Sequence, residues 1–484
     1  MQDGNYYYKP SIVGKMDNVY WLRHLSHKVV ENAFGDKLCG FTIALEAWRR
    51  GLTVTVNSHR ASQFQSYVIS SAHNSIQFNR ARIASLTAKR AIAVLNNKYT
   101  TKESLLKEGV PTPLGKKFNF NDPYESVIDF VRLIGWPVVI KPLVGSLGRG
   151  VYTNINNDDD LLVYCKYIIE KLNVKNYLIE KYVVGEDYRI LANNEKIFAA
   201  AKRIPANIVG NGVDSIMKLI SVKNAARRKN PNYYNRMIKI DNEVEYYVKN
   251  KGYDFDSVLP KDLVLYLRGK ANTSSGGDLI DVTDDITPDI AHAAIKAIKA
   301  IDGLEFGGVD LLYDSNTGNF SIIEVNSRPQ IGHMYPTSGL GRDIPRMLID
   351  TYFPEAPVRH EDINPHFVFD VNKILSPLVS GVAGSITVAP KKNFENFVRR
   401  RYLLKGSLSI SDNKLSSRLL AIAKKHNVFG SVGKDKEGRL LFCLGGDKLA
   451  VSYFINEVCE ILSCIKESSK IWKGVIKQSF IVNF

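Results

Sequence analysis

Three oxygen-bearing side chains have the types and the spacing of a metal site. Asp310 lies in a predicted strand over 308–312, and Glu324 and Asn326 lie two residues apart in a second predicted strand over 320–326. A spacing of two places both side chains on one face of a strand. If the two strands pair, three oxygen ligands converge, as Mg²⁺ requires when it also binds nucleotide phosphates. The alternative is a set of polar strand residues facing solvent, but the apolar residues around them argue against it.

A lysine in an apolar strand and the glycine-dense loop after it suggest an anion. Lys141 lies in the predicted strand over 136–142, and a lysine is costly to bury unless it meets a negative charge. In the loop over 145–151, glycines allow backbone N–H groups to turn toward phosphate oxygens. Most glycine loops are only turns, so this signal is weak when it stands alone.

The composition is that of an ordinary globular chain. Its 484 residues are 45% hydrophobic and 24% charged, which excludes a fibrous repeat or a disordered tail protein and fits about three domains. The five cysteines form no CxxC or Cys/His pairing, so a reducing, cytoplasmic location is expected rather than disulfides or structural zinc. The first residues lack the pattern of a signal peptide, and no run of 18 apolar residues predicts a membrane span.

The positive charge is concentrated toward the end of the chain. The formal net charge is +16, and residues 391–484 contain 18 Lys and Arg against 8 Asp and Glu. A basic domain of this kind could hold nucleic acid or another polyanion. The alternative is a solvated basic surface without a partner, and both interpretations stay open.

The pattern of elements predicts a chain of several domains. Residues 1–96 have the helix and strand signals of a small α/β domain, and 97–355 alternate strands with amphipathic helices. Residues 356–375 contain prolines and little apolar periodicity, which predicts a linker. Residues 376–484 have the order strand, helix, strand, strand, helix, strand.

Several motifs, in order along the chain, resemble the ATP-grasp superfamily of ligases. They are 97–113, 138–142, 145–151, 179–182 and 323–326. Three further segments are similar to the ATP-grasp part of cyanophycin synthetase and to bifunctional glutathione synthetases: 201–212, 238–244 and 271–284. The resemblance covers about 75–355. It implies an α/β and α+β fold in which an N-terminal α/β domain precedes two α+β lobes that clamp ATP.

The resemblance implies a nucleotide site. Lys98 and Lys141 would contact the α- and β-phosphates, and the loop with Ser146 and Gly148 would fold over them. The adenine edge would be held by Glu180 and by the backbone from Lys181 to Val183. Asp187 would bind the ribose hydroxyls, with Glu186 as a competitor for that position.

The resemblance also implies the metal and the catalytic groups. Asp310, Glu324 and Asn326 would hold Mg²⁺ or Mn²⁺. Arg203 and Arg268, beside Asn272 and the 274–277 loop, would clamp the γ-phosphate and an acyl phosphate. His333 follows the metal strand, and we expect a packed or solvated histidine rather than a catalytic one.

The implied reaction is ATP-dependent ligation of a carboxylate to an amine. The carboxylate attacks the γ-phosphate, and an amine then displaces phosphate, which requires positioning and charge neutralisation more than a covalent nucleophile. The resemblance favours an amino-acid or peptide substrate, and Arg328 or Arg342 could bind a substrate carboxylate or be surface cations. A different nucleophile, such as a thiol or a polysaccharide amine, is an alternative. An ATP-regulated module that holds a polyanion is another.

Two features qualify the resemblance. Cyanophycin synthetases continue into a domain with its own P-loop, and no G-x-x-x-x-G-K-[ST] motif follows residue 355 here. Residues 376–484 instead faintly resemble acylphosphatases. Arg418 could match the arginine of that family, but Gly433 stands where its asparagine is expected, so we expect a non-catalytic domain. A homo-oligomer is plausible from the superfamily.

Overall fold

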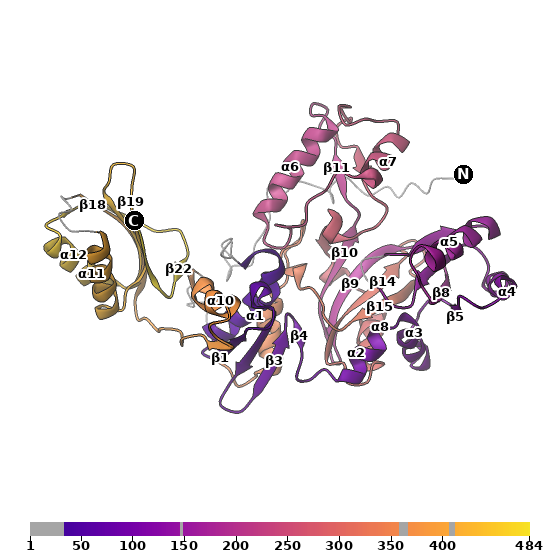
Figure 1. The fold of residues 1–484 in the computed structure, drawn as a ribbon, viewed down its shortest axis with the longest axis horizontal. Coiled ribbons are helices and arrows are strands. Elements are labelled where there is room, and N and C mark those ends of the chain that lie inside the picture. Colours follow the sequence, from indigo (N-terminus) through magenta and orange to yellow (C-terminus); the bar gives the residue numbers. More distant parts are fainter. Residues whose placement is uncertain (1–32, 146–148, 358–365, 406–411) are drawn as a thin grey trace. The chain divides into compact units, whose positions relative to one another are not determined.

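The computed structural model describes residues 33–145, 149–357, 366–405 and 412–484 (Figure 1). Backbone packing divides the described chain into two compact units. One is Ile76–Met347, and the other combines residues 33–75 with 348–484. The packing thus separates the chain after Ser75 and after Met347. The domain boundaries expected from the sequence remain predictions.

The first unit contains a four-stranded antiparallel sheet that carries Lys141. Its order is β5 (Gly115–Asn119), β8 (Asn176–Lys181), β6 (Val138–Pro142), β7 (Tyr152–Ile155). Apolar residues of α4 (Tyr124–Ile134) and α5 (Asp158–Glu170) form its core together with the strands. Asn157 caps α5 by accepting a hydrogen bond from the Asp160 N–H, and three aspartates in the first turn suit the helix dipole.

A five-stranded antiparallel sheet forms the centre of the same unit. Its order is β13 (Asp278–Asp281), β10 (Ile197–Ile204), β9 (Glu186–Asn193), β14 (Phe306–Tyr313), β15 (Phe320–Asn326). Helix α8 (Pro288–Lys299) packs its apolar stripe against this sheet, and the Thr287 side chain caps the helix by accepting from the Ile290 N–H. Because side chains alternate along a strand, the other face is left to polar groups from β9, β10 and β14.

Helix α3 (Lys98–Lys107) and a small satellite complete the surroundings of the site. Asn97 caps α3 by accepting from the Tyr99 N–H at 2.9 Å, and the short helix α2 (Lys89–Leu95) precedes it. The satellite pairs β11 (Asn207–Val209) with β12 (Val264–Tyr266). It packs them with α6 (Ile216–Lys229) and α7 (Asn242–Asn250) around its own apolar core. The hairpin β3 (Ser75–Asn79) and β4 (Arg82–Ile83) lies at the start of the unit.

The second unit is built around a buried helix. All of α1 (Leu38–Arg49) is buried, and the strands β17 (Ser385–Thr387), β1 (Thr53–Asn57) and β2 (Ser66–Ser70) pair antiparallel. The linker prediction for 356–375 is wrong for its second half, which contains β16 (Phe367–Val368) and the start of α10 (Val371–Val379). The prolines suggested a linker, but Phe367 and Phe369 are buried aromatic residues that fix this segment in the core.

The sheet order of the C-terminal part is β21 (Ile465–Ile471), β18 (Phe397–Lys405), β20 (Leu440–Asp447), β19 (Phe429–Lys434), β23 (Phe480–Asn483). From β18 to β21 the C-terminal part has the order strand, helix, strand, strand, helix, strand, with the end of α10 and β17 before it and two further short strands after it. Helices α11 (Asp412–Lys425) and α12 (Lys448–Ile461) share its core, as in a split βαβ arrangement. A short strand, β22 (Ile476–Lys477), pairs parallel with β16. The acylphosphatase resemblance stays a prediction, and Arg418 is exposed on α11.

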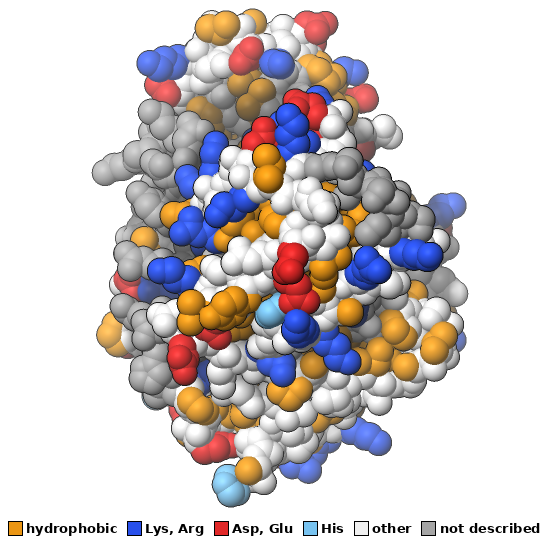
Figure 2. All heavy atoms as spheres, turned by 90° about the vertical axis from the view of Figure 1, so that its left-hand side faces the viewer, with side chains coloured by type: hydrophobic (Ala, Val, Ile, Leu, Met, Phe, Trp, Pro, Cys, Tyr) orange, Lys and Arg blue, Asp and Glu red, His pale blue; other side chains and the backbone are white. Residues whose placement is uncertain are grey.

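Two surface properties bear on partners. Among the described residues, no helix is both long and apolar enough to cross a membrane. On the face drawn in Figure 2, the described Lys and Arg side chains are interspersed with acidic and hydrophobic ones. The boundary between the two compact units after Met347 falls within helix α9 (Ile344–Tyr352).

Candidate active site

The predicted metal ligands lie on paired strands. In the β14–β15 pair, Asp310 is directly opposite Glu324, and Gly308 is opposite Asn326. The pairing that the sequence interpretation required is therefore confirmed, and the three oxygen-bearing side chains share one face of the sheet. Their role in binding a metal remains a prediction.

The two carboxylates have opposite electrostatic environments. Burial raises the pKa of Asp310, but Arg189 and Arg203 outweigh this effect and hold it below its usual range. Arg189 Nη2 donates to Asp310 Oδ2 at 2.8 Å, and Arg203 Nη2 lies 3.4 Å from the same oxygen. Burial and the neighbouring Asp310 raise the pKa of Glu324. A cation bound beside Glu324 would stabilise the ionised form of its carboxylate.

The donor set suits a hard cation that keeps some of its own ligands. Among the described residues, no group of three or more His, Cys, Asp or Glu side chains could hold a metal ion. Two carboxylates and the Asn326 amide oxygen nevertheless match Mg²⁺, which is held by one or two carboxylates together with water and phosphate oxygens. The residues present therefore fit the implied ion.

Lys141 meets the anion that its burial requires, and that anion is Glu180. The Glu180 carboxylate is 4% exposed and forms ion pairs with Lys141 and, at 2.7 Å, with Lys102 Nζ. Burial raises the pKa of Glu180, but the two lysines lower it further, so that it lies below its usual value. The structure therefore places the buried carboxylate of β8 between two cations, Lys141 of β6 and Lys102 of α3.

Lys98 joins this group from the start of α3. Its Nζ donates to the Gly145 carbonyl at 3.0 Å. Burial lowers the pKa of Lys98, and Lys141 adds to that effect while Glu324 and Glu180 oppose it. The lysines and the metal-site carboxylates therefore interact as one electrostatic group. A small pocket between them is lined by Leu95, Lys98, Thr101, Lys102, Leu105, Thr112, Glu180, Ile323 and Glu324.

Lys102 is a site residue that the sequence interpretation missed. It is 3% exposed, and its Nζ also donates to Thr112 Oγ1 at 3.2 Å and to the Pro113 carbonyl. One signal could have found it, because Lys98 and Lys102 are four residues apart and share one face of a helix.

The structure separates the two candidates for the ribose. Asp187 lies on the same face as Asp310 and accepts from Arg203 Nε at 2.8 Å. Burial raises the pKa of Asp187 to about 6, although Arg203 opposes the shift. Glu186 instead forms an ion pair with Lys202 at 2.5 Å on the other face. This placement favours Asp187, and its contact with ribose remains a prediction.

Arg268 is not joined to this group by any contact of the described residues. Arg203 binds Asp187 and lies beside Asp310, whereas Arg268 forms ion pairs at 2.6 Å with Asp241 and Glu243 of the α7 start. Both acids raise the pKa of Arg268 against the effect of burial. The γ-phosphate role of the two arginines remains a prediction.

The remaining nucleotide residues lie at the end of β8. The Lys181 N–H donates to the Leu114 carbonyl at 2.8 Å, and its Nζ donates to the Trp136 carbonyl at 2.6 Å. Val183 is the second residue after the end of the strand. Ser146 and Gly148 lie outside the described residues.

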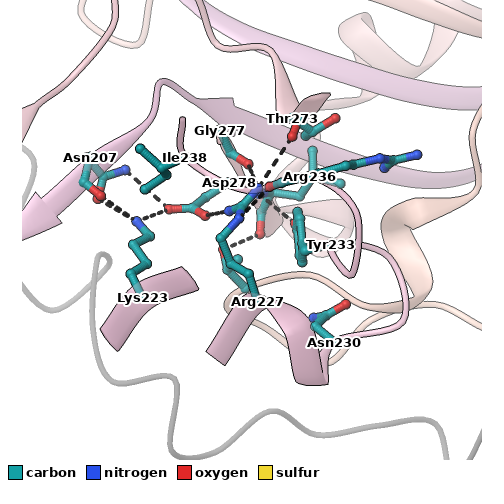
Figure 3. Close-up of polar contacts among 12 residues, drawn as sticks. Asn207, Lys223, Arg227, Asn230, Tyr233, Arg236, Ile238, Thr273, Gly277 and Asp278 are labelled. Atoms are coloured by element: carbon teal, nitrogen blue, oxygen red, sulfur yellow. Dashed lines mark hydrogen bonds and ion pairs between the residues drawn. The ribbon is translucent and has the colours of Figure 1, made fainter. Parts of the chain in front are cut away.

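A buried cluster holds the 272–277 loop (Figure 3). Asp278 accepts from Arg227 Nη1 at 2.8 Å and from Lys223 Nζ at 2.6 Å, and Arg227 is completely buried. Arg227 Nη2 also donates to the Gly277 carbonyl at 3.2 Å. The loop is thereby fastened to α6, so Asp278 and Arg227 support a segment predicted to contact phosphate.

His333 is a packed residue, as expected. It is 3% exposed, and its Nε2 lies 3.1 Å from the Arg189 carbonyl. Burial lowers the pKa of His333 to about 4, and the nearby Arg189 and Arg203 guanidinium groups act in the same direction. The imidazole is therefore neutral at physiological pH.

Comparison with known proteins identifies relatives of part of the chain. The chain is 34% identical over 285 residues to a cyanophycin synthetase of Synechocystis sp., which covers 57% of this chain and 32% of that protein. It is 30% identical over 269 residues to the glutathione biosynthesis bifunctional protein of Desulfotalea psychrophila, covering 54% and 34% of the two chains. No family model matches the sequence.

A solved structure is also similar. The bifunctional glutathione synthetase from Pasteurella multocida is 27% identical, with a TM-score of 0.48 over 60% of this chain and 40% of that one. The sequence relatives confirm the predicted resemblance of the chain to ATP-grasp ligases. Cyanophycin synthetases and bifunctional glutathione synthetases are among the relatives that the chain matches. The chain spans about a third of the length of these curated relatives.

Proposed function

We propose that this protein is an ATP-dependent carboxylate–amine ligase acting on an amino acid or a peptide. The observation that carries the proposal is the Asp310–Glu324 pair on β14 and β15, which interacts electrostatically with Lys98 and Lys141. Paired acids beside a buried and a half-buried lysine match a metal-bound triphosphate. The relationship to two kinds of synthetase supports the same chemistry.

In the proposed reaction, a substrate carboxylate oxygen attacks the γ-phosphorus and ADP leaves. An amine nitrogen then attacks the acyl carbon, phosphate leaves, and the nitrogen loses a proton to form the amide. Asp310, Glu324 and Asn326 would hold Mg²⁺, which when bound neutralises phosphate charge.

The cations of the chain have separate tasks in this scheme. Lys98 and Lys141 would attract the phosphates, and Lys102 would retain Glu180 when Lys141 turns toward them. Arg203 is held in place by Asp187 and supplies positive charge beside the metal ligands. These groups provide electrostatic stabilisation without a covalent protein intermediate.

The direct test is nucleotide turnover with Mg-ATP and pools of amino acids and small peptides. Products would be separated as ADP or AMP, and new masses would be searched in the same samples. We expect ADP together with a mass that corresponds to an added residue. AMP formation would contradict the acyl-phosphate route, and the absence of turnover with every pool would contradict the proposed substrate class.

A single substitution tests the metal ligands. Glu324→Gln keeps the shape of the side chain and removes its charge, so we expect ADP formation to fall by about 100-fold or more while the circular dichroism spectrum is unchanged. Asp302→Asn is the matched control, because Asp302 is an exposed acid of the same unit. ADP formation by the Glu324 variant at the rate of the control would remove Glu324 from the site.

A further inference from the structure

The segment after α6 contains an arginine whose charge no described acid balances. Arg236 is half-buried, and its Nη1 donates to Asn232 Oδ1 at 2.7 Å while its Nη2 donates to Gln330 Oε1 at 3.4 Å. Both partners are neutral amide oxygens. Over the described ranges, Arg236 forms no ion pair. A guanidinium held in this way keeps its full charge for an incoming anion.

The arginines around it differ in this respect. Arg227 is paired with Asp278, and Arg268 with Asp241 and Glu243. Arg342, one of the two arginines that the sequence suggested for a substrate carboxylate, binds Asp281 at 2.9 Å and Asp284 at 2.7 Å. Its charge is already matched twice. Arg236 is therefore better placed than Arg342 to bind a carboxylate.

Asn232 supplies a second, independent observation. Asn232 is only 3% exposed, and its side-chain Nδ2 has no hydrogen-bond partner among the described residues. Because Oδ1 of the same amide accepts from Arg236, the orphan Nδ2 lies next to the guanidinium. Buried donors are rarely left unsatisfied. The unpaired N–H and the unbalanced cation thus occur together.

The backbone around this pair is closely packed. Gly332 lies against the Asn232 amide, and a Cβ atom at Gly332 would lie 2.7 Å from Nδ2. On the other side, Arg227 Nε donates to the Arg236 carbonyl at 2.8 Å. Tyr233 Oη accepts from the Leu279 N–H at 3.1 Å, and the Tyr233 ring lies beneath the Arg227 guanidinium. The donors are therefore held by the cluster that also fastens the 272–277 loop.

The pair is connected to the candidate active site. Figure 3 shows the Arg236 side chain extending away from Asp278 and Lys223. Gln330 and Gly332, which contact the pair, follow the metal strand β15. His333, the next residue, contacts the Arg189 carbonyl, and Arg189 binds Asp310.

We propose that Arg236 and Asn232 Nδ2 form a binding subsite for a substrate carboxylate that does not react. The guanidinium and the amide N–H donate to the two oxygens of one carboxylate, which satisfies the orphan donor and balances the charge. This inference rests on the proposed function and narrows it, because the substrate must carry a free carboxylate besides the one that is activated.

The test measures binding to the full chain with Mg²⁺ and ADP present. The probes are L-aspartate, L-glutamate and L-alanyl-L-alanine, each compared by calorimetry with its α-carboxamide. We expect wild type to bind at least one carboxylate about 30-fold more tightly than the matching amide. Arg236→Met should abolish that preference. Arg228→Met, which changes an exposed arginine of the preceding helix α6, should retain it.

A second variant keeps the site folded. Asn232→Asp preserves the acceptor for Arg236, removes the orphan donor and gives the guanidinium a carboxylate of its own, so we expect the same loss of preference. The inference is wrong if Arg236→Met and Asn232→Asp bind the carboxylates as wild type does. It is equally wrong if wild type binds none of these probes.

The two proposals fail in different ways. If wild type forms ADP and Arg236→Met has the same KM for the substrate, the ligase proposal is retained and the subsite proposal is wrong. If carboxylate probes bind through Arg236 but no substrate pool yields ADP, the subsite proposal is retained and the ligase proposal is wrong. If both proposals are correct, we expect Arg236→Met to raise KM about 30-fold and to change kcat little. A contact to a carboxylate that does not react stabilises the bound substrate and the transition state equally.

Discussion

At the scale of single residues, the site depends on buried carboxylates that each pair with two cations. Glu180 lies between Lys102 and Lys141, and Asp310 lies between Arg189 and Arg203. Removing one partner from a buried ion pair is more costly than replacing the whole group, because the charge that remains is buried and unpaired. Each carboxylate therefore supports the local fold as well as the proposed chemistry.

Glu180→Gln tests this dependence. The change leaves two buried lysines without their carboxylate, and we expect the free energy of unfolding to fall by about 3 kcal/mol or more. Urea denaturation is the measurement. The double variant Lys102→Met with Glu180→Gln removes one of the two cations and should recover part of the loss. Equal stability of wild type and Glu180→Gln would show that the lysines find other partners.

His333 predicts a dependence of stability on pH. Its pKa is about 4 in the folded chain, compared with about 6.5 when unfolded, so below pH 6.5 the unfolded state binds more protons. This contribution to stability is complete above pH 6.5 and declines as the pH falls to 4. At pH 5 the loss is about 2 kcal/mol.

The measurement compares unfolding free energies at pH 7.5 and pH 5. We expect His333→Gln to lose less stability between these values than wild type by about 2 kcal/mol. His292→Gln is the control, because His292 is exposed on α8. A wild-type pH dependence in the His333 variant would mean that other groups cause it.

The sequence predicts site residues where regular spacing carries the information. Asp310, Glu324 and Asn326 were identifiable because strand periodicity and apolar neighbours constrain them, and the pairing of β14 with β15 brings them together. Arg236 was not, because its distinguishing property is the absence of an acid partner among described residues. That property depends on how separate loops meet and has no local pattern.

At the scale of elements, Gly115 provides the room for the Glu180 cluster. It is directly opposite Glu180 in the β5–β8 pair. A Cβ atom there would lie 2.7 Å from Glu180 Cγ and 3.0 Å from the backbone oxygen of Ile179. Both contacts are too close, and a buried carboxylate held by two lysines has little freedom to move.

Gly115→Ala should therefore displace Glu180 from its lysines. We expect affinity for Mg-ATP to fall about 10-fold or more, measured by calorimetry, since Lys141 would lose its fixed position. Lys117→Ala is a control on the exposed part of the same strand. Unchanged ATP affinity in the glycine variant would show that the strands can separate locally without affecting the site.

Elements with strong local signals were predictable, and those fixed by distant contacts were not. The spacing of polar and apolar residues in β14 and β15 predicted both strands from sequence. Residues 366–375 were included in the linker predicted over 356–375 because of prolines that precede them. The buried aromatic residues among them belong to a core built with α1, which is more than 300 residues earlier in the chain.

At the scale of the whole molecule, the division into two compact units predicts two thermal transitions. Mg-ATP should raise only the transition of Ile76–Met347, because the candidate site lies within that unit. Ile298→Ala should lower this transition and Phe367→Ala the other, since each side chain is buried in one core. Scanning calorimetry is the measurement, and a single transition that responds to all three changes would contradict independent units.

The edge of the C-terminal sheet has a consequence for the behaviour of the protein at high concentration. Among the described strands β21 pairs only with β18, and most of its residues are exposed, including Ile465 and Ile471. An open edge of this kind invites a strand from another molecule. Lys466 and Lys470 are exposed along it, and charged lysines on an edge strand oppose such pairing. The same two residues would thus act as gatekeepers against aggregation, and their neutralisation would remove that protection.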